Sequence, residues 1–565
     1  MNRSQNETYA VPSVSLAVDR YIVNAATILI AFLLVFFMLF PLYKILVMSF
    51  FKEGIFSLEN FTLGNYIKYF GTPRIAKSLY NSLYVSIITM VITTTLAFFL
   101  AYALTRTTIL GKGFFYTVAF MPLIAPSIIQ ALALILLFGR NGLITAHLFK
   151  TGWSIYGAWG IIISEVLYCL PHALVILYTT LSAVDTRLDE AAESLGANAL
   201  QVFWKVTIPS AKYGILSAAA LTFNLTITDF GNPVVIGGDF NVLATEIYSQ
   251  VTNLYRFDLG ATVSVILLVP SVAAFMFNYY VTRKSFALIS GAASPFIRPS
   301  RHLKKWGFTV YCILISASII LVFTTVVMGS FVKVWPYDWS LTLKHYRFPS
   351  LGGYSAIWTS LWISILVGFF GAFFTLIAGY IVEKKKPFGV QLLYLLSVMP
   401  AAIPGLVLGL GYILAFNRPY YIFYGTPWII VICVVIANFT LGTLSSISNI
   451  KNIDPSIEEA ATSLGSTSIS TFVRLVFPLS KVAFFQNFVY FFMRSMTTIS
   501  AVIFLVSATV HLAAIEIIWL DNDGWMASAD AMSTCVIGIV LLMLGFLRLV
   551  MGKKGGSHVM AGGTT

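Results

Sequence analysis

Residues 185–209 read DTRLDEAAESLGANALQVFWKVTIP, and residues 454–478 read DPSIEEAATSLGSTSISTFVRLVFP. The two segments, here named the first elbow and the second elbow, align without a gap, since 459 minus 190 and 478 minus 209 are both 269. Each elbow lies between long apolar runs. We therefore expect a chain of two related halves, each carrying one copy of this connector.

Both elbows have the local signals of a helix–turn–helix. Asp185 and Asp454 can cap a first helix, because a carboxylate accepts hydrogen bonds from the unpaired N–H groups at a helix start. Pro455 suits the first helical position, where no N–H donor is needed. Gly196 and Gly465 are expected to end this helix, because glycine enters the left-handed conformation freely.

A second short helix is expected after each glycine. In the first elbow, Asn198 and Gln201 form a capping pair that can start this helix. Its apolar positions would face a partner protein or the membrane, and they are Leu200, Phe203, Trp204 and Ile208.

The composition is that of a polytopic membrane protein. Of 565 residues, 58% are hydrophobic and 10% are charged, and the mean hydropathy is +0.87, whereas about half of an ordinary globular chain is apolar. The formal net charge of +13 would suggest nucleic acid for a soluble protein, but in a membrane protein it first reflects topology. The four cysteines stand alone in apolar segments, so neither a disulfide nor a structural metal site is expected.

Crossing the hydrocarbon core takes roughly 20 apolar residues, and about twelve runs are long enough. The first half contributes Tyr21–Leu46, Leu79–Leu104, Phe114–Phe138, Ala158–Leu181, Tyr213–Ile236 and Ala261–Val281. The second half contributes Phe308–Phe331, Ile357–Ile381, Gln391–Phe416, Trp428–Ser448, Val482–Val506 and Ala531–Val550. The predicted fold class is an all-α integral membrane protein made of two parallel six-helix repeats.

Basic residues predict the orientation in the membrane. Clusters lie between the halves and at 384–386 after the eighth span, and such clusters stay on the cytoplasmic side. Both elbows and both chain ends are therefore expected in the cytoplasm, and a nucleic-acid partner has no support. The expected divisions are a first domain at 1–282, a basic cytoplasmic linker at 283–305 and a second domain at 306–565.

The halves also repeat outside the elbows. The triplet N-S-L at 81–83 resembles T-S-L at 359–361, and M-P-x-x-x-P occurs at both 121–126 and 399–404. Since the halves have equal numbers of expected spans and begin on the same side, the repeat is parallel about an axis along the membrane normal. A pathway between the halves is the simplest expectation.

The elbows share the pattern E-A-A-x-x-x-G followed by apolar-x-apolar-Pro, as EAAESLG…VTIP and EAATSLG…LVFP. This pattern resembles the EAA loop of the permeases of binding-protein-dependent ABC importers. In that family the loop docks into a groove of a cytoplasmic ATPase and carries the movement of ATP hydrolysis into the membrane. The resemblance implies this ATPase-coupling role for Glu190, Ala191, Ala192, Gly196, Pro209, Glu459, Ala460, Ala461, Gly465 and Pro478.

The resemblance also implies the partners. It implies two copies of an ABC ATPase subunit in the cytoplasm, an extracytoplasmic substrate-binding protein, and a location in the bacterial cytoplasmic (inner) membrane. Because the sequence has no G-x-x-x-x-G-K-[ST] motif to hold phosphates, we expect no enzymatic activity and no cofactor or metal bound by this chain, with ATP used by the partner subunits.

The cargo is suggested by a narrower resemblance. The fused architecture and the segment TDFGNPVVIGGDFNVLATEIY at 228–248 resemble the ferric iron permease branch. That branch also contains permeases similar to transporters of phosphonates, sugar phosphates and thiamine, so these cargoes stay open.

Ionisable side chains inside expected spans are candidate pathway residues, because each costs roughly 2.5–3.5 kcal/mol at a helix centre and tends to face a cavity or a partner. Asp229 opens a D-F-G-N-P segment that is expected to break the fifth span as a gate or cargo site would. The candidates are Glu165, His172, Asp229 and Arg494.

Two readings of these residues stay open. In the first, Asp229 and Glu165 line a pathway, and their carboxylates suit a hard trivalent cation. In the second, an acid pairs with Arg494 and the other groups face wet pockets between helices. If Arg494 itself lined the pathway, an anionic cargo such as a phosphonate would be favoured.

A secondary transporter driven by an ion gradient is the rival class, because it can also have two parallel six-helix repeats. Such carriers often have a G-x-x-x-D-R-x-G-R-type loop after the second span, where this chain reads RTTILGKG without the acid. A channel is disfavoured, since no loop resembles a selectivity filter. Basic residues expected on the exterior could bind acidic lobes of a binding protein or be scattered solvated charges, and they are Arg74, Arg140, Arg256, Arg347 and Arg418.

Overall fold

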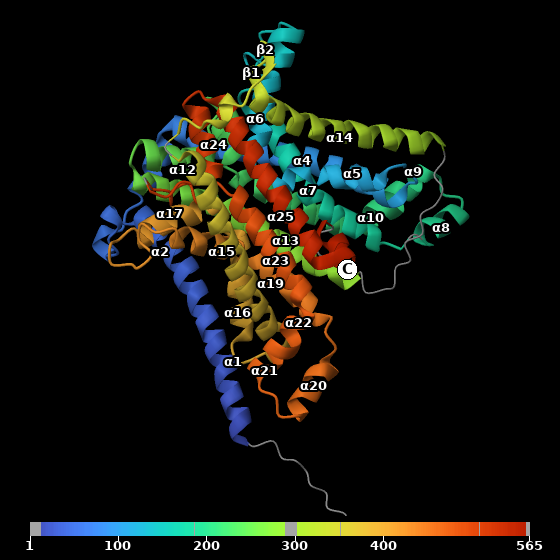
Figure 1. The fold of residues 1–565 in the computed structure, drawn as a ribbon, viewed down its shortest axis with the longest axis vertical. Coiled ribbons are helices and arrows are strands. Elements are labelled where there is room, and N and C mark those ends of the chain that lie inside the picture. Colours follow the sequence, from blue (N-terminus) through green and yellow to red (C-terminus); the bar gives the residue numbers. More distant parts are fainter. Residues whose placement is uncertain (1–12, 186, 289–301, 351, 508, 561–565) are drawn as a thin grey trace, which may run out of the picture.

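The computed structural model describes residues 13–185, 187–288, 302–350, 352–507 and 509–560. Most of the linker predicted at 283–305, and both ends of the chain, therefore lie outside the described residues. Within the described residues the chain is almost entirely helical, with one two-stranded sheet (Figure 1).

The first half contains thirteen α-helices in its described residues. They are α1 Ser13–Leu34, α2 Phe40–Phe50, α3 Gly64–Gly71, α4 Pro73–Arg106, α5 Lys112–Ala119, α6 Ile128–Phe138, α7 Ala158–Ala183, α8 Arg187–Ser194, α9 Ala199–Val202, α10 Ile208–Thr228, α11 Gly231–Ile236, α12 Leu243–Tyr248 and α13 Phe257–Leu288. Short 3₁₀ or π segments lie at Val35–Leu39, Lys52–Gly54, Leu58–Asn60, Met121–Ile124, Leu143–Leu148, Phe203–Thr207 and Ser249–Asn253.

The second half adds twelve α-helices and the sheet. The helices are α14 His302–Phe331, α15 Gly353–Tyr380, α16 Val390–Val398, α17 Gly405–Phe416, α18 Trp428–Ala437, α19 Phe439–Lys451, α20 Pro455–Ser463, α21 Ser468–Thr471, α22 Phe477–Leu479, α23 Lys481–Thr497, α24 Ala513–Asn522 and α25 Met526–Met560. The antiparallel strands are β1 Val332–Val334 and β2 Asp338–Leu341, with Val332 opposite Leu341. Short 3₁₀ or π segments lie at Lys344–Tyr346, Ile381–Lys385, Met399–Ala402 and Phe472–Val476.

Within the described residues, 8 helices are long and apolar enough to cross a membrane, or up to 11 if each of three bent pairs is one span. The all-α fold class is confirmed, and several of the expected spans are broken. The expected fifth span at 213–236 is α10, which ends at Thr228 before Asp229 and is followed by the short α11. The D-F-G-N-P segment therefore interrupts this span as predicted.

The expected third and ninth spans are also broken, at the two M-P-x-x-x-P motifs. In the second half, the helical segments Val390–Ala402 and Gly405–Phe416 meet at an angle of 108°. In the first half, Met121–Ile124 is a 3₁₀ turn, and α6 begins only at Ile128. Proline has no N–H donor and disfavours helical geometry in the residue before it, so the motif that revealed the repeat also ends these helices.

Two further breaks in the second half were not predicted. The expected tenth span is bent by 56° between α18 and α19, where the side chain and the backbone N–H of Asn438 both donate to Val434 O. The expected eleventh span at 482–506 ends at Thr497, whose hydroxyl donates to Met493 O. Such local side-chain hydrogen bonds compete with continuation of a helix. Asn and Thr are common inside helical segments, however, so their presence in a sequence does not by itself predict a break.

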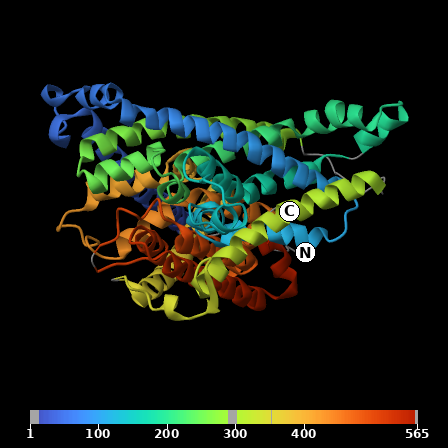
Figure 2. The ribbon, with the colours of Figure 1, turned by 90° about the horizontal axis from the view of Figure 1, so that it is seen from above.

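Each half places its first helix on the other half. In the first span, Asp19–Phe50, the ring centre of Phe36 lies 5.5 Å from that of Phe416 in α17, and α1 also packs on α15 and α16. Conversely, α14 packs on α4, α5 and α6, and the hydroxyl of Tyr311 in α14 donates to Leu96 O in α4 over 2.7 Å. Figures 1 and 2 show α14 (yellow-green) running toward the same side of the molecule as α4 (blue). The halves therefore form one packed body with a shared core.

Candidate functional site

Both elbows turn at a left-handed glycine, as predicted. Gly196 has a φ of +87°, and its N–H donates to Glu193 O over 2.9 Å, while Ala197 N–H donates to Ala192 O over 3.0 Å. This pair of bonds is a common way to end a helix with glycine, because it satisfies two of the last carbonyls.

The second elbow repeats this turn. Gly465 has a φ of +79°, with bonds from its N–H to Thr462 O (2.9 Å) and from Ser466 N–H to Ala461 O (3.0 Å). The equal geometry extends the sequence repeat to backbone conformation.

The first helix of each elbow is capped by the predicted aspartate. Asp185 Oδ1 accepts a hydrogen bond from Arg187 N–H over 2.9 Å, and Asp454 Oδ1 accepts one from Ser456 N–H over 2.9 Å. The hydrogen bonds from Ser456 lower the pKa of Asp454 below its usual value, because they favour the charged carboxylate.

The second helix of each elbow is capped by its own side chain, and in the second elbow this is Thr467, whose Oγ1 accepts the N–H of Ser470 over 3.3 Å. Asn198 and Gln201 form the predicted capping box, with Gln201 N–H donating to Asn198 Oδ1 over 2.9 Å and Asn198 N–H donating to Gln201 Oε1 over 2.8 Å. In the second elbow, Asp19 of α1 accepts hydrogen bonds from both the N–H and the hydroxyl of Ser468, the first residue of α21. No sequence pattern could reveal this contact, because the two residues are 449 positions apart.

The elbows present matching apolar side chains to the outside. Leu195, Leu200 and Trp204 are 88%, 67% and 62% exposed, and their counterparts Leu464, Ile469 and Val473 are 88%, 53% and 57% exposed. Phe203 was expected on this outward face, but it packs against Tyr102 of α4, with ring centres 6.0 Å apart. Phe203 faces α4 whereas Leu200 and Trp204 face outward, so only the latter two are available to a partner.

The predicted coupling residues occupy equivalent places on two arms, with α8 at the right and α20 at the bottom of Figure 1. Most of them are exposed or half-buried, and only Ala461 is buried. The exposed ones are Ala191, Gly196, Pro209, Glu459, Ala460, Gly465 and Pro478, and the half-buried ones are Glu190 and Ala192.

Two candidate pathway acids, Asp229 and Glu165, are brought together by Asn232. Asp229 accepts hydrogen bonds from the hydroxyl of Ser127 (2.9 Å) and from Asn232 N–H (2.9 Å). The side-chain amide of Asn232 donates to Glu165 Oε1 over 3.1 Å. Glu165 and Asn232 are fully buried, and Asp229 is 9% exposed. We call Ser127, Glu165, Asp229 and Asn232 the carboxylate cluster.

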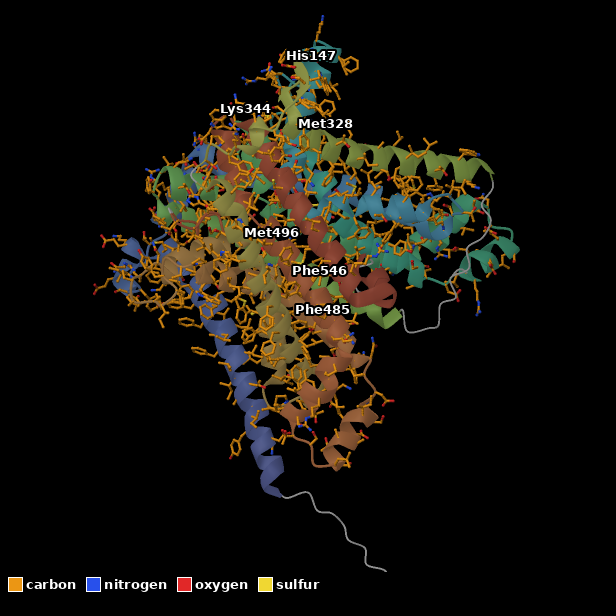
Figure 3. The ribbon with its side chains drawn as sticks, viewed as in Figure 1. His147, Met328, Lys344, Phe485, Met496 and Phe546 are labelled. Carbon is orange, nitrogen blue, oxygen red and sulfur yellow. The ribbon has the colours of Figure 1, made fainter. Side chains whose placement is uncertain are left out.

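Arg494 does not join these acids in an ion pair of the described residues. Its Nε donates to Asn438 Oδ1 over 3.2 Å, and the same oxygen accepts the hydroxyl of Tyr490 over 3.2 Å. Arg494 also lies beside Tyr168 of α7, so it contacts the first half. Met496, two residues further along, lies near the middle of the molecule, whereas His147 and Lys344 lie at the end away from the second elbow (Figure 3).

His172 contacts Tyr168 of its own helix. Its Nδ1 lies 3.3 Å from Tyr168 O one turn earlier in α7, and the two rings are 5.5 Å apart. It therefore contributes no hydrogen bond to the carboxylate cluster.

Three fully buried acids were missed by the sequence analysis, namely Glu246, Glu516 and Asp530. Glu246 and Glu516 are counterparts, since 516 minus 246 is 270, as is 499 minus 229. Glu246 accepts from the side chain of Gln250 over 2.7 Å, and Glu516 lies 2.9 Å from His511 Nδ1. The repeat offset could have identified this pair.

The short helices that carry these glutamates are fastened by the N-S-L and T-S-L triplets. Ser82 Oγ accepts the N–H of Leu243 at the start of α12 over 2.7 Å, and Ser360 Oγ accepts the N–H of Ala513 at the start of α24 over 2.8 Å. The triplets noted in the sequence therefore make the same contact twice.

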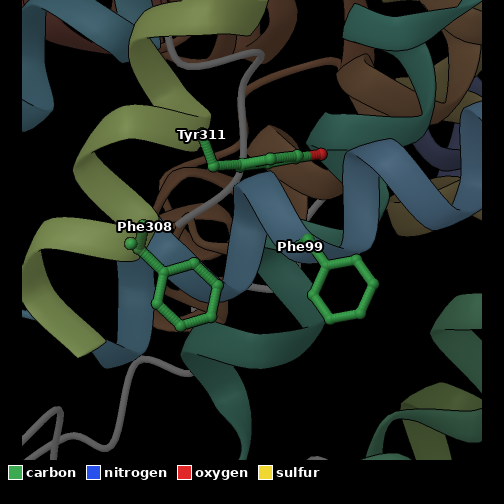
Figure 4. A pocket seen from close by; sticks show the side chains of 4 residues that line it. Phe99, Phe308 and Tyr311 are labelled. Carbon is green, nitrogen blue, oxygen red and sulfur yellow. The ribbon is translucent and has the colours of Figure 1, made fainter. Parts of the chain in front are cut away.

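One surface depression lies between α4 and α14, lined by Phe99, Gly307, Phe308 and Tyr311, with a volume of about 400 Å³ (Figure 4). Its walls carry no charged group, so it is unsuited to an ionic cargo. Among the described residues, no group of three or more His, Cys, Asp or Glu side chains is placed to hold a metal ion.

Comparison with known families finds the same domain twice. Residues 94–287 and 371–553 each match the family described as the binding-protein-dependent transport system inner membrane component. The two matches cover more than half of the chain, and each contains one elbow. The chain belongs to this family of permeases.

The permease also has relatives along nearly its whole length. It is 30% identical to the ferric transport system permease protein FbpB of Actinobacillus pleuropneumoniae over 94% of this chain and 79% of the relative. It is 29% identical to the putative ferric transport system permease protein FbpB 1 of Haemophilus influenzae over 87% of this chain and 79% of the relative. The molybdenum transport system permease protein ModB of Haemophilus influenzae is 26% identical over 33% of this chain and 83% of the relative. The permease is thus a multi-pass ABC-type inner membrane protein, and these relatives are transporters rather than enzymes.

Proposed function

We propose that this permease is the membrane subunit of an ATP-driven importer of iron(III), which moves cargo delivered by an extracytoplasmic binding protein by alternating access. The pair of equal elbows carries this proposal. Each elbow exposes three matching apolar side chains at the end of an arm, and exposed apolar surface of this kind marks an interaction site. Two equivalent surfaces suit two copies of one ATPase subunit.

The choice of iron is supported by two observations. Two relatives that align with 94% and 87% of the chain are named as ferric transport permeases. In addition, Asn232 holds the carboxyl groups of Asp229 and Glu165 in one buried cluster, and carboxylate oxygens suit hard cations. Iron is here the cargo in transit, and the chain is proposed to bind no cofactor of its own.

In the proposed orientation, the elbows and both chain ends lie in the cytoplasm, in agreement with the basic clusters of the sequence. Closure of the ATPase dimer around ATP would push α8 and α20 and rock the two halves between inward-open and outward-open states. Glu190 and Glu459 are proposed to contribute charge to the ATPase contact, while Gly196 and Gly465 permit the turns.

Reconstitution tests this proposal. The permease, purified with its ATPase subunit and placed in liposomes with the binding protein, should take up radioactive iron(III) only when ATP is hydrolysed. A non-hydrolysable ATP analogue serves as the control, and an ionophore that removes ion gradients should have no effect. Uptake that follows an ion gradient without any ATPase subunit would point to a secondary transporter, and uptake of a phosphonate in place of iron would correct the cargo.

A further inference from the structure

The end of the second span holds the first elbow through an arginine. Arg106, the last residue of α4, donates from Nη2 to Val184 O over 2.9 Å, and its Nη1 lies 3.4 Å from Asp189 Oδ2 in α8. Val184 is the residue just before Asp185, the cap of α8. The Arg106 side chain is only 7% exposed, so these contacts are shielded from water.

The eighth span holds the second elbow at the corresponding place. Lys384 Nζ donates to Ile453 O over 2.8 Å, and Ile453 is the residue just before Asp454, the cap of α20. The positions correspond by the two offsets of the repeat, since 384 minus 106 is 278 and 453 minus 184 is 269.

An aromatic contact accompanies each cation one turn earlier in the same span. Tyr102 lies 6.0 Å from Phe203 of the first elbow, and Tyr380 lies 5.2 Å from Phe472 of the second elbow, measured between ring centres. These positions follow the same offsets, since 380 minus 102 is 278 and 472 minus 203 is 269. Each span end therefore contacts its elbow at two places, the cation just before the first helix and the tyrosine just after the second.

We propose that Tyr102 with Arg106, and Tyr380 with Lys384, are two equivalent grips that transmit elbow movement to the second and eighth spans. This inference rests on the proposed function. Without a grip, α8 could swing about its connector at Val184 while α4 stayed in place. With it, the connector, the elbow and the span end move together, because a charge-assisted hydrogen bond and a ring contact fix them at two points.

One grip uses an arginine and the other a lysine to bind the equivalent carbonyl. Exchanging the two residue types therefore tests whether a positive charge at this place is sufficient. In the liposome assay, Arg106→Gln combined with Lys384→Gln should lower uptake about tenfold, because glutamine is neutral and shorter and so loses the charge-assisted hydrogen bond to the carbonyl, while the ATPase rate stays within about twofold of the parent. Arg106→Lys and Lys384→Arg should keep uptake near the parent value, because each retains a positively charged donor to the carbonyl.

Lys386→Gln is the matched control. Lys386 is exposed and only two positions from Lys384, so this variant loses the same charge from the same segment and should behave as the parent. Equal loss of uptake and ATPase activity in the double variant, or equal loss in Lys386→Gln, would overturn the proposal, because it would mean a general fault of folding or charge.

A measurement on the permease alone separates this inference from the proposed function. Hydrogen exchange of the α8 amides should become about tenfold faster in Arg106→Gln than in the parent, with no partner present. If the parent complex takes up no iron yet α8 loosens in this way, the proposed function fails and the grip contact stands. If exchange in α8 is unchanged by Arg106→Gln, the grip is wrong whatever the cargo.

Discussion

Asn232 accounts for the closeness of two buried acids. Its backbone N–H binds Asp229 and its side chain binds Glu165, while Ser127 supplies a third donor. A buried carboxylate costs several kcal/mol unless donors surround it, so these side chains depend on one another. Any substitution in the carboxylate cluster must be judged by the partners that it leaves unpaired.

Asp229 gives the most direct test of the pathway. Asp229→Asn keeps the shape of the side chain and removes its charge, so we expect uptake to fall by more than about tenfold while the level in the membrane matches the parent. Asp229→Ala should also abolish uptake. It should lower the free energy of unfolding by about 1–3 kcal/mol for each donor left unpaired, namely Ser127 and Asn232. Unchanged uptake kinetics in Asp229→Asn would remove Asp229 from the pathway.

Gly196 tests the turn of the first elbow. An added Cβ there meets no atom within 4 Å, so a substitution acts only through its backbone preference at a φ of +87°. Gly196→Val should strain the turn by about 1–3 kcal/mol and uncouple uptake from ATP hydrolysis in the liposome assay. Gly196→Asn is the control, because asparagine tolerates this region. Normal ATP-dependent uptake by the valine variant would count against the elbow mechanism.

At the scale of helices, the elbows have equal turns but unequal anchors. The second helix of each elbow is capped by its own residue, Asn198 in the first elbow and Thr467 in the second, but that of the second elbow is also bound by Asp19 of α1. An N-cap contributes about 0.5–2 kcal/mol. Asp19 therefore ties the second elbow to the N-terminal helix.

This difference predicts selective loosening. Asp19→Ala should speed hydrogen exchange in α21 and leave α9 unchanged, and Asn198→Ala should have the opposite effect. Exchange measured by mass spectrometry on the permease checks both variants together. Equal changes in the two elbows after Asp19→Ala would contradict a local anchor.

Helix breaks could be predicted only where a few adjacent residues, such as a glycine, a proline or a capping residue, disfavour a continuous helix. The elbow glycines, the capping residues and the D-F-G-N-P break follow from a few adjacent residues, and they were predicted. The M-P-x-x-x-P breaks carry the same kind of signal, although the apolar runs that predict the third and ninth spans continue across them. The bend at Asn438 and the end of α23 at Thr497 involve residues that are compatible with a helix elsewhere.

At the scale of the whole molecule, the two-half organisation and the fold class followed from the sequence because they rest on repeats and apolar length. The side-chain partners did not. Arg494 binds Asn438, 56 residues away, and Arg106 binds Val184, 78 residues away. Contacts of this kind depend on how spans pack, which no local pattern records. The repeat offset was the one signal that could have linked Glu246 with Glu516 or Arg106 with Lys384.

The first helix of each half packs on the other half, so the first span cannot reach its final packing until the second half has been synthesised. Phe36 in the first span packs on Phe416, which the ribosome adds 380 residues later (416 minus 36). At about 5–20 residues per second, the first span stays roughly 20–80 s in the bilayer before Phe416 is synthesised. During that interval its aromatic face must be covered by lipid or by the insertion machinery.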